Sequence, residues 1–385
     1  MSEWKKVRLG EIANYVNEKI DIKAFDTSLY ISTDSMLKDK GGIGTPESIP
    51  ESGKVTKYQH NDILVSNIRP YFKKIWFSNR EGGCSNDVLV FRANDNIDST
   101  FLYYVLSDDS FFDHIMSSAN GTKMPRGNRK LIPSFEINLP PLSTQHRIAT
   151  ILSRYDSLIE NYQKQIKLLE EAAQRLYKEW FVDLRFPGHE NTKIVDGVPE
   201  GWEKKPISQL GEYLNGFAFK PSDWQKSGKP IIKIKEMGNG VSNDTPRNNG
   251  ERVPAKYLVK AGDLLFSWSA TLMVIVWSGE EGWLNQHLFK VTPSKGIERE
   301  FLLQSISNTI EEFQNLTTGS TMKHIQRNKL DQVFVNVPND EIMKRYSSIA
   351  EKERTEILHL SSQIRLLSEA RDRLLPKLMG GEIKF

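Results

Sequence analysis

The stretch QIKLLEEAAQRL at residues 165–176 returns as QIRLLSEARDRL at residues 363–374, with eight of twelve positions identical and no gap. The apolar positions recur at steps of three and four, the heptad spacing that keeps one face of a helix against a partner helix. The two copies lie 198 residues apart in a chain of 385 residues. Solenoid repeats have periods of only about 20–50 residues, so a period this long predicts a duplicated domain.

The repeat extends well beyond these two helices. WKKVRLGEIANYVN (4–17) aligns without gaps on WEKKPISQLGEYLN (202–215), and DILVS (62–66) matches DLLFS (263–267) at a slightly larger offset. In both copies, short runs rich in Val, Ile, Phe and Trp predict strands, and segments with helical periodicity follow them. We therefore expect an α+β fold made of two similar mixed α/β domains.

Each predicted domain is followed by a long helix with a continuous apolar stripe. A first helix spanning about residues 145–182 would be roughly 55 Å long at 1.5 Å per residue, too long to pack wholly on one small domain. Glu353 and Arg371 also fall on the second stripe, where they either fix the register of a coiled coil or face solvent. The predicted seam residues are Leu152, Tyr155, Ile159, Tyr162, Ile166 and Leu169 in the first helix and Ile357, Leu360, Ile364 and Leu367 in the second.

The chain is too long for one ordinary core and has room for two domains. The stretch RFPGHENTKIVDGVPEGW (185–202), rich in Pro, Gly and charge, is expected to end the first helix and let the second domain begin. The predicted segments are a first domain at 1–142, a first helix at 143–184, a linker at 185–201, a second domain at 202–338, a second helix at 339–379 and a tail at 380–385.

Composition limits the classes of protein to which this chain can belong. Hydrophobic residues at 38% and aromatic residues at 10% are typical of a folded protein, and no apolar run is long enough to span a bilayer. The first residues lack the apolar core of a signal peptide, so we expect a cytoplasmic protein. Cys84 is the only cysteine, which excludes an internal disulfide and favours a small buried side chain. The net charge of +3 restricts any affinity for phosphate to local patches.

Three short motifs accompany the repeat in a fixed order. LYKEWFVDLRF (176–186) closes the first helix, VPEGW (198–202) opens the second domain, and LLPKLMGGEIKF (374–385) follows the second helix. With the duplicated domains and helices, this combination resembles the specificity subunit of Type I restriction-modification systems over essentially the whole chain. The first domain departs from the pattern, because it opens with MSEW (1–4) where the second has Pro-x-Gly-Trp (199–202).

The resemblance implies that each domain reads one half of a bipartite target in double-stranded DNA. It also implies that the two helices pair antiparallel, set the spacer between the half-sites and dock two methyltransferase (modification) subunits. Methylation and cleavage would then belong to those subunits and to separate restriction/translocase subunits. The duplication gives one chain a near two-fold axis, so two copies of an identical partner can bind equivalently.

Basic loops without acidic residues are the segments most like DNA-contacting elements. They are SNIRPYFKK (66–74), ANGTKMPRGNRK (119–130) and TTGSTMKHIQRNK (317–329), whereas SWSATLM (267–273), the counterpart of the first, has no charge. Lys and Arg contact phosphates, while Arg, Asn and Gln bond base edges; ordinary solvated loops, and a core position for Trp268, are the alternatives. The predicted DNA-binding residues are Ser66, Asn67, Arg69, Lys73, Lys74, Asn120, Thr122, Lys123, Arg126, Asn128, Arg129, Ser267, Trp268, Ser269, Thr318, Ser320, Thr321, Lys323, His324, Gln326 and Arg327.

The sequence carries no motif of an enzyme. NLPPLS (138–143) differs from the Asn/Asp-Pro-Pro-aromatic strand end of an adenine methyltransferase, because Leu139 intervenes and no aromatic follows the prolines. No glycine-rich nucleotide loop is complete, and the seven histidines lack the spacing of metal ligands. We therefore expect no catalytic residue, cofactor or metal in this chain. The rival hypothesis is a duplicated coiled-coil scaffold that binds proteins and not DNA.

Overall fold

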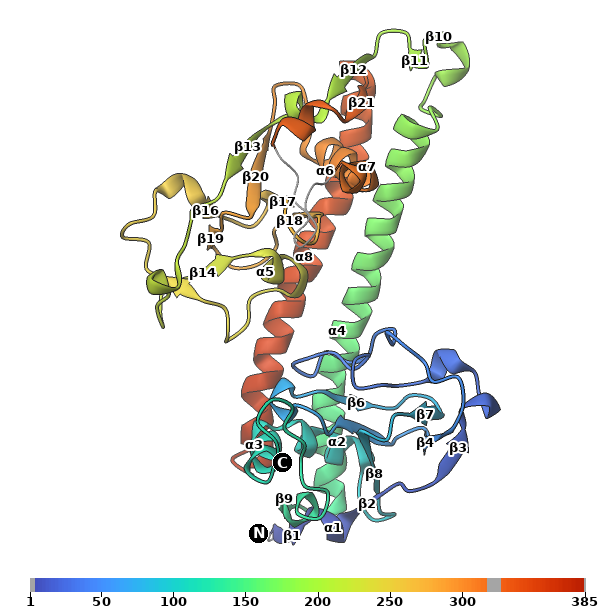
Figure 1. Cartoon of the computed structure of the whole chain (residues 1–385), viewed down its shortest axis with the longest axis vertical. Coiled ribbons are helices and arrows are strands. Elements are labelled where there is room, and N and C mark those ends of the chain that lie inside the picture. The colour runs from blue at the N-terminus through green and yellow to red at the C-terminus, as the bar shows by residue number, and fades with distance from the viewer. Residues whose placement is uncertain (1–3, 317–326, 384–385) are drawn as a thin grey trace. The chain divides into compact units, whose positions relative to one another are not determined.

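The computed structural model describes residues 4–316 and 327–383, and these form two compact units (Figure 1). Unit 1 combines residues up to Ile159 with those from Leu367 onward, and unit 2 comprises Glu160–Leu366. Both units contain antiparallel strands and helices, which confirms the α+β class expected from the sequence.

Unit 1 is built on a four-stranded antiparallel sheet in the order β2-β8-β5-β6. A three-stranded sheet, β3-β4-β7, lies against it, and β1 pairs with β9. The strands are β1 (Lys5–Arg8), β2 (Ala13–Tyr15), β3 (Lys19–Asp21), β4 (Lys54–Tyr58), β5 (Ile63–Ser66), β6 (Ile75–Phe77), β7 (Gly82–Cys84), β8 (Val88–Ala93) and β9 (Glu136–Leu139). The helices are α1 (Leu9–Ile12), α2 (Ser99–Ser107) and α3 (Asp109–Ser117), with short 3-10 turns η1 (Ile22–Ala24), η2 (Thr27–Leu29), η3 (Pro70–Phe72) and η4 (Ile132–Ser134).

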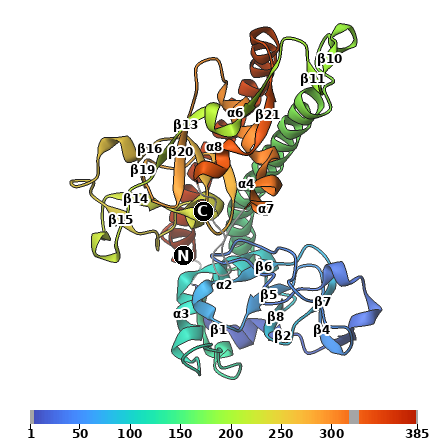
Figure 2. The ribbon, with the colours of Figure 1, turned by 45° about the horizontal axis from the view of Figure 1, so that its top comes forward.

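The central sheet of unit 1 is covered on both faces. Alternate residues of a strand point to opposite faces, so Ile63 and Val65 join the core that contains α2 and α3, while Leu64 faces the smaller sheet. Figure 2 shows α2 beside β6 and β8. Cys84 is fully buried between the two sheets, where burial raises the pKa of its thiol to about 12. The expectation of a small buried cysteine is therefore confirmed.

Unit 2 repeats this plan. Its four-stranded sheet, β13-β20-β17-β18, has the strand order of the sheet in unit 1, and β12 pairs with β21 as β1 pairs with β9. A second sheet, β15-β14-β19-β16, contains one parallel pair, β14 with β19. The strands are β10 (Ile194–Val195), β11 (Val198–Pro199), β12 (Glu203–Pro206), β13 (Gly211–Asn215), β14 (Lys229–Ile232), β15 (Arg247–Asn248), β16 (Leu258–Val259), β17 (Leu264–Ser267), β18 (Met273–Val276), β19 (Gly282–Leu284), β20 (Leu288–Pro293) and β21 (Phe334–Val337). The helices are α5 (Ile234–Asn239), α6 (Arg299–Asn308) and α7 (Ile310–Asn315), with 3-10 turns η6 (His189–Asn191), η7 (Ile207–Gln209), η8 (Pro221–Asp223), η9 (Ala255–Tyr257) and η10 (Arg327–Asp331).

Two long helices contribute to both units: α4 (Leu142–Tyr177), which ends in a π-helical turn (Lys178–Val182), and α8 (Asp340–Met379). In unit 1 the first turns of α4 share a core with the last turns of α8, through Leu152 and Leu378. In unit 2 the end of α4 shares a core with the start of α8. The helices therefore run in opposite directions in each unit. Within the described parts of the chain, no helix is long and apolar enough to cross a membrane.

The predicted seam residues differ in how deeply they lie. Leu152 belongs to the core that unit 1 builds around the start of α4, whereas the other predicted seam residues lie farther along the two helices. Leu152, Ile159, Ile357 and Leu360 are buried, while Tyr155, Tyr162, Ile166, Leu169, Ile364 and Leu367 are partly exposed.

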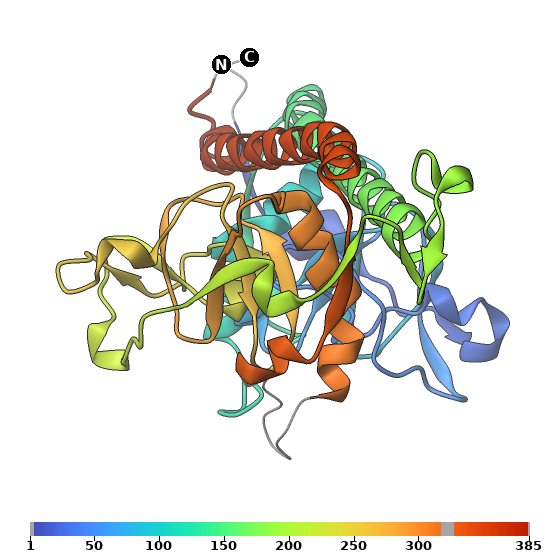
Figure 3. The same ribbon diagram turned by 90° about the horizontal axis from the view of Figure 1, so that it is seen from above.

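A charged side chain of each long helix forms a hydrogen bond with the domain that precedes that helix. In unit 1, Asp156 on α4 accepts hydrogen bonds from the Tyr104 hydroxyl on α2 (2.5 Å) and from the Arg371 guanidinium on α8 (2.6 Å). In unit 2, Arg354 on α8 stands 198 residues after Asp156, and its Nε donates to Glu300 on α6 at 3.0 Å. Figure 3 shows the ribbon of the two helices from above, α8 in red and α6 in orange. Equivalent positions of the two helices therefore contact both domains, through the acidic Asp156 in unit 1 and the basic Arg354 in unit 2.

Candidate nucleic-acid interface

The hairpin turn of unit 1 (residues 66–74) starts where β5 ends. The Ser66 hydroxyl donates to the carbonyl of Ile68 at 3.1 Å, and Arg69 then adopts a left-handed conformation with φ of 50°. Lys73, after η3, is also left-handed, with φ of 49°. Such conformations cost non-glycine residues of order 1–3 kcal/mol each, and they persist only where the surroundings hold them in place.

The basic loop of unit 1 (residues 119–130) holds this turn. The backbone N–H of Arg69 donates to the carbonyl of Pro125 at 2.8 Å, and that of Gly127 donates to the carbonyl of Asn67 at 3.2 Å. A Cβ at Gly127 would lie 2.4 Å from Ile115, so only glycine permits this close approach. Two loops that the sequence indicated separately therefore lie together.

The predicted DNA-binding side chains of unit 1 range from buried to exposed. Arg126 is exposed and forms an ion pair with Asp87 at 3.1 Å, while the Arg129 guanidinium lies 5.6 Å from the centre of the Tyr15 ring. Burial raises the pKa of that tyrosine to about 12, so Tyr15 remains a neutral platform. Ser66 and Asn67 are buried, Arg69, Lys73, Lys74 and Asn128 are partly buried, and Asn120, Thr122, Lys123, Arg126 and Arg129 are exposed.

In unit 2, the turn after β17 is shorter than the hairpin turn of unit 1, but it begins with the same backbone conformation and carries different side chains. The Ser267 hydroxyl donates to the carbonyl of Ser269 at 3.1 Å, and Ala270 is left-handed like Arg69, with φ of 57°. Ser267 and Ser269 are buried, whereas Trp268 is partly buried and packs 6.0 Å from the ring of Phe289. Arg327 is exposed, and the predictions at Thr318, Ser320, Thr321, Lys323, His324 and Gln326 lie outside the described residues.

A third loop of unit 1, which the sequence did not indicate, lies against the hairpin turn. This lysine loop (residues 36–44) carries Lys38 and Lys40, and its backbone donates two hydrogen bonds to the turn. The stretch LKDKGG (37–42) has two lysines, but Asp39 between them hides it from a search for basic stretches without acids.

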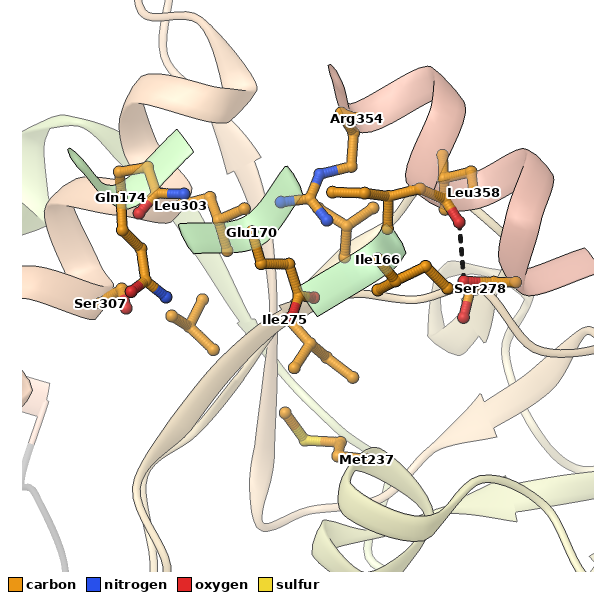
Figure 4. A pocket seen from close by; sticks show the side chains of 15 residues that line it. Ile166, Glu170, Gln174, Met237, Ile275, Ser278, Leu303, Ser307, Arg354 and Leu358 are labelled. Carbon is orange, nitrogen blue, oxygen red and sulfur yellow. Dashed lines mark hydrogen bonds between the residues drawn. The ribbon is translucent and has the colours of Figure 1, made fainter. Parts of the chain in front are cut away.

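Unit 2 also contains a cavity of about 350 Å³ between α4, α8, α6 and β18 (Figure 4). Its polar lining includes Glu170 and Arg354, and its apolar lining includes Ile275 of β18. Burial raises the pKa of Glu170, against the opposing effect of the Arg354 charge. Of the residues predicted to contact DNA, none that the structure describes lines this cavity. Among the described residues, no group of three or more His, Cys, Asp or Glu side chains could hold a metal ion.

Comparisons with known proteins agree with the presence of two similar domains in the chain. The family described as Type I restriction modification DNA specificity domain matches the chain twice, over residues 1–171 and 199–364. The Type I restriction enzyme HindI specificity subunit of Haemophilus influenzae is 26% identical, with 100% of each chain covered. The MjaVIII specificity subunit of Methanocaldococcus jannaschii is 24% identical over 99% of this chain and 93% of its own.

A solved structure shows the same fold. The crystal structure of a Type I restriction-modification system S subunit from M. genitalium matches with a TM-score of 0.53 and 15% identity, covering 98% of this chain and 96% of that chain. The duplicated domain, the equivalent turns in the two units and the double family match lead to one assignment. The chain belongs to the family of Type I restriction modification DNA specificity domains, and it contains two of them.

Proposed function

We propose that this chain is the non-catalytic DNA sequence-recognition subunit of a Type I restriction-modification complex. The observation that carries the proposal is the presence of two DNA specificity domains in one chain, with turns that begin with the same backbone conformation and carry different side chains. Residues 1–142 and 202–338 would each read one half of a bipartite target. A site read by a single domain would be too short to be distinguished from the many other sequences of a genome, because each wrong base pair weakens the binding free energy by only about 1–3 kcal/mol.

The proposed partners are double-stranded DNA, two methyltransferase subunits and the restriction/translocase subunits. The relatives are named as specificity subunits of Type I restriction enzymes, which supports this assembly. The helices at 143–184 and 339–379, with the linker at 185–201, would set the spacer and dock the methyltransferase subunits. A complex that modifies chromosomal DNA acts where that DNA lies, so we infer a cytoplasmic location. The family match favours this function over a protein-binding scaffold.

Mapping methylated adenines tests the proposal directly. Genomic DNA would be sequenced from cells that carry this protein together with its neighbouring methyltransferase, and from matched cells that carry the methyltransferase alone. We expect a bipartite motif with a gap of fixed length, present only when this chain is present. A continuous motif, or the same motif in both cells, would contradict the proposed function.

Replacing Lys123, Arg126 and Arg129 with alanine should blunt recognition of one half-site only. Each arginine that bonds a base edge contributes about 1–3 kcal/mol, so the affinity for the target should fall on the order of 10²-fold. Binding to duplexes with substitutions in either half-site measures this effect. The control replaces three exposed lysines outside these loops, Lys6, Lys23 and Lys54. Equal loss of discrimination at both half-sites would show that the two domains are not separate readers.

A further inference from the structure

The lysine loop of unit 1 is an ordered element with its own internal bonds. Met36 and Ile43 form an antiparallel bridge, and the backbone N–H of Leu37 donates to the carbonyl of Gly42 at 2.9 Å. Asp39 and Lys40 at its tip both have positive φ, of 55° and 62°. Backbone strain at two adjacent non-glycine residues indicates that contacts from outside the loop hold the tip in place.

Those contacts come from the hairpin turn. The backbone N–H groups of Asp39 and Lys40 donate to the carbonyls of Phe72 and Lys73, at 2.9 and 3.0 Å. The ammonium group of Lys38 lies 4.0 Å from the centre of the Phe72 ring, close enough for a cation–π contact. Because the turn is also bonded to the basic loop, the lysine loop extends a surface that already contains residues predicted to bind DNA.

Positive charges converge at this junction. Lys40 and Lys73 share the carboxylate of Asp109, at 3.1 and 2.8 Å, so two ammonium groups converge on a single anionic group. Burial lowers the pKa of neighbouring Lys74, and the positive charge of Lys38 lowers it further, against the opposing effect of the Asp34 and Glu47 carboxylates. Mutual repulsion of this kind is relieved when a polyanion adds negative charge beside the lysines.

We propose that the lysine loop is a third DNA-contacting element of unit 1, in which Lys38 and Lys40 contact the phosphate backbone. This inference rests on the proposed function and extends it to residues that lie outside the basic stretches. Phosphate contacts fix the position of a protein on the duplex and carry no sequence information. The lysine loop therefore contributes affinity and not base preference.

The lysine loop has a counterpart of different sequence in unit 2. The lysine loop follows Ile31, which forms a parallel bridge with Cys84. The corresponding segment of unit 2 follows Ile232, which pairs in parallel with Leu284. That segment begins with Lys233 and Lys235, at the start of α5, and its remainder, MGNGVSNDT (237–245), has no lysine or arginine. The lysines therefore stand at different positions in the two units.

The test is the salt dependence of DNA binding by the full chain carrying Lys38→Ala and Lys40→Ala. Losing two phosphate contacts should reduce the slope of log affinity against log salt by about 0.9 for each contact. Target and non-target duplexes should weaken by the same factor. A matched control with Lys23→Ala and Lys54→Ala, both exposed and outside the three loops, should keep the wild-type slope.

The outcomes separate this inference from the proposed function. If the wild-type chain shows no salt-dependent DNA binding, the proposed function itself fails. If the wild type binds and the double alanine variant keeps its slope, or if the control loses as much, only the role of the lysine loop is overturned. The charge-conserving pair Lys38→Arg and Lys40→Arg should retain the slope, whereas a loss there would mean that loop structure, not charge, governs binding.

Discussion

Raising the salt concentration from about 50 to about 200 mM is expected to weaken binding of this chain to double-stranded DNA by ~10³ to 10⁵-fold. That range corresponds to about six to ten phosphate contacts, because each contact releases counterions condensed on the DNA. The net charge of the chain is only +3, so local loops and not overall charge would produce the effect. Fluorescence anisotropy of a labelled duplex, titrated at several salt concentrations, measures it.

The same titration of the variant in which Lys123, Arg126 and Arg129 are alanine shows whether the basic loop produces part of this effect. Its slope should be smaller by roughly 0.9 for every one of the three that contacts a phosphate. A protein-binding scaffold would instead bind DNA weakly, with no difference between this variant and the wild type. That second pattern would favour the rival hypothesis.

Replacing Arg354 with leucine is expected to lower the free energy of unfolding of unit 2 by about 3 kcal/mol. Arg354 and Glu300 are both nearly fully buried, and removing one partner of a buried ion pair leaves a charge without its counterion. Arg299 still contacts Glu300 at 3.2 Å, so the loss should lie near the lower end of the range for such pairs. Urea unfolding followed by far-ultraviolet circular dichroism measures the change.

Two further variants identify the cause of this destabilisation. Arg345→Leu removes an exposed arginine from the same helix and should change stability by less than about 0.5 kcal/mol. Replacing Glu300 and Arg354 together with leucine should recover part of the stability, because Glu300 is then no longer left without Arg354, while Glu170 and Glu353 still lose the opposing charge of Arg354. If the double variant is as unstable as Arg354→Leu, lost packing and not an unpaired charge explains the effect.

The stability of the Arg354→Leu variant should also depend on pH. Burial raises the pKa of Glu300 even with Arg354 present, although Arg354 opposes the shift. A carboxyl whose pKa is higher in the folded than in the unfolded chain destabilises the fold once pH exceeds its unfolded value. The deficit of the variant should therefore shrink as pH falls toward that value.

The sequence predicted the elements whose signal is local and repeated. The heptad spacing around Ile166 and Ile364, and the gapless match of Trp4 with Trp202, are enough by themselves to indicate duplicated domains and long helices. The turn at Arg69 and the loop at Lys123 were both indicated as basic segments. Their meeting depends on backbone hydrogen bonds between distant residues, which charge patterns do not encode.

Other features could not be predicted because the same sequence pattern is compatible with two different structures. Lys38 and Lys40 flank an aspartate, so the stretch looks like a solvated loop of mixed charge. Arg354 and Glu300 look like exposed residues of two amphipathic helices until α6 is placed on α8. A tryptophan after a strand, such as Trp268, has the same sequence signal whether its ring packs on a core or faces a ligand.

Unit 1 takes residues from before position 160 and after position 366, and this division constrains the order of events on the ribosome. Translation finishes every residue of unit 2 before Leu375 and Leu378, which unit 1 needs to complete its core, have been added to the nascent chain. Domains generally fold as units while synthesis proceeds. Most of unit 1 is therefore translated first, but its core is completed last. A message that ended after position 366 would still encode all of unit 2 and would leave the core of unit 1 incomplete.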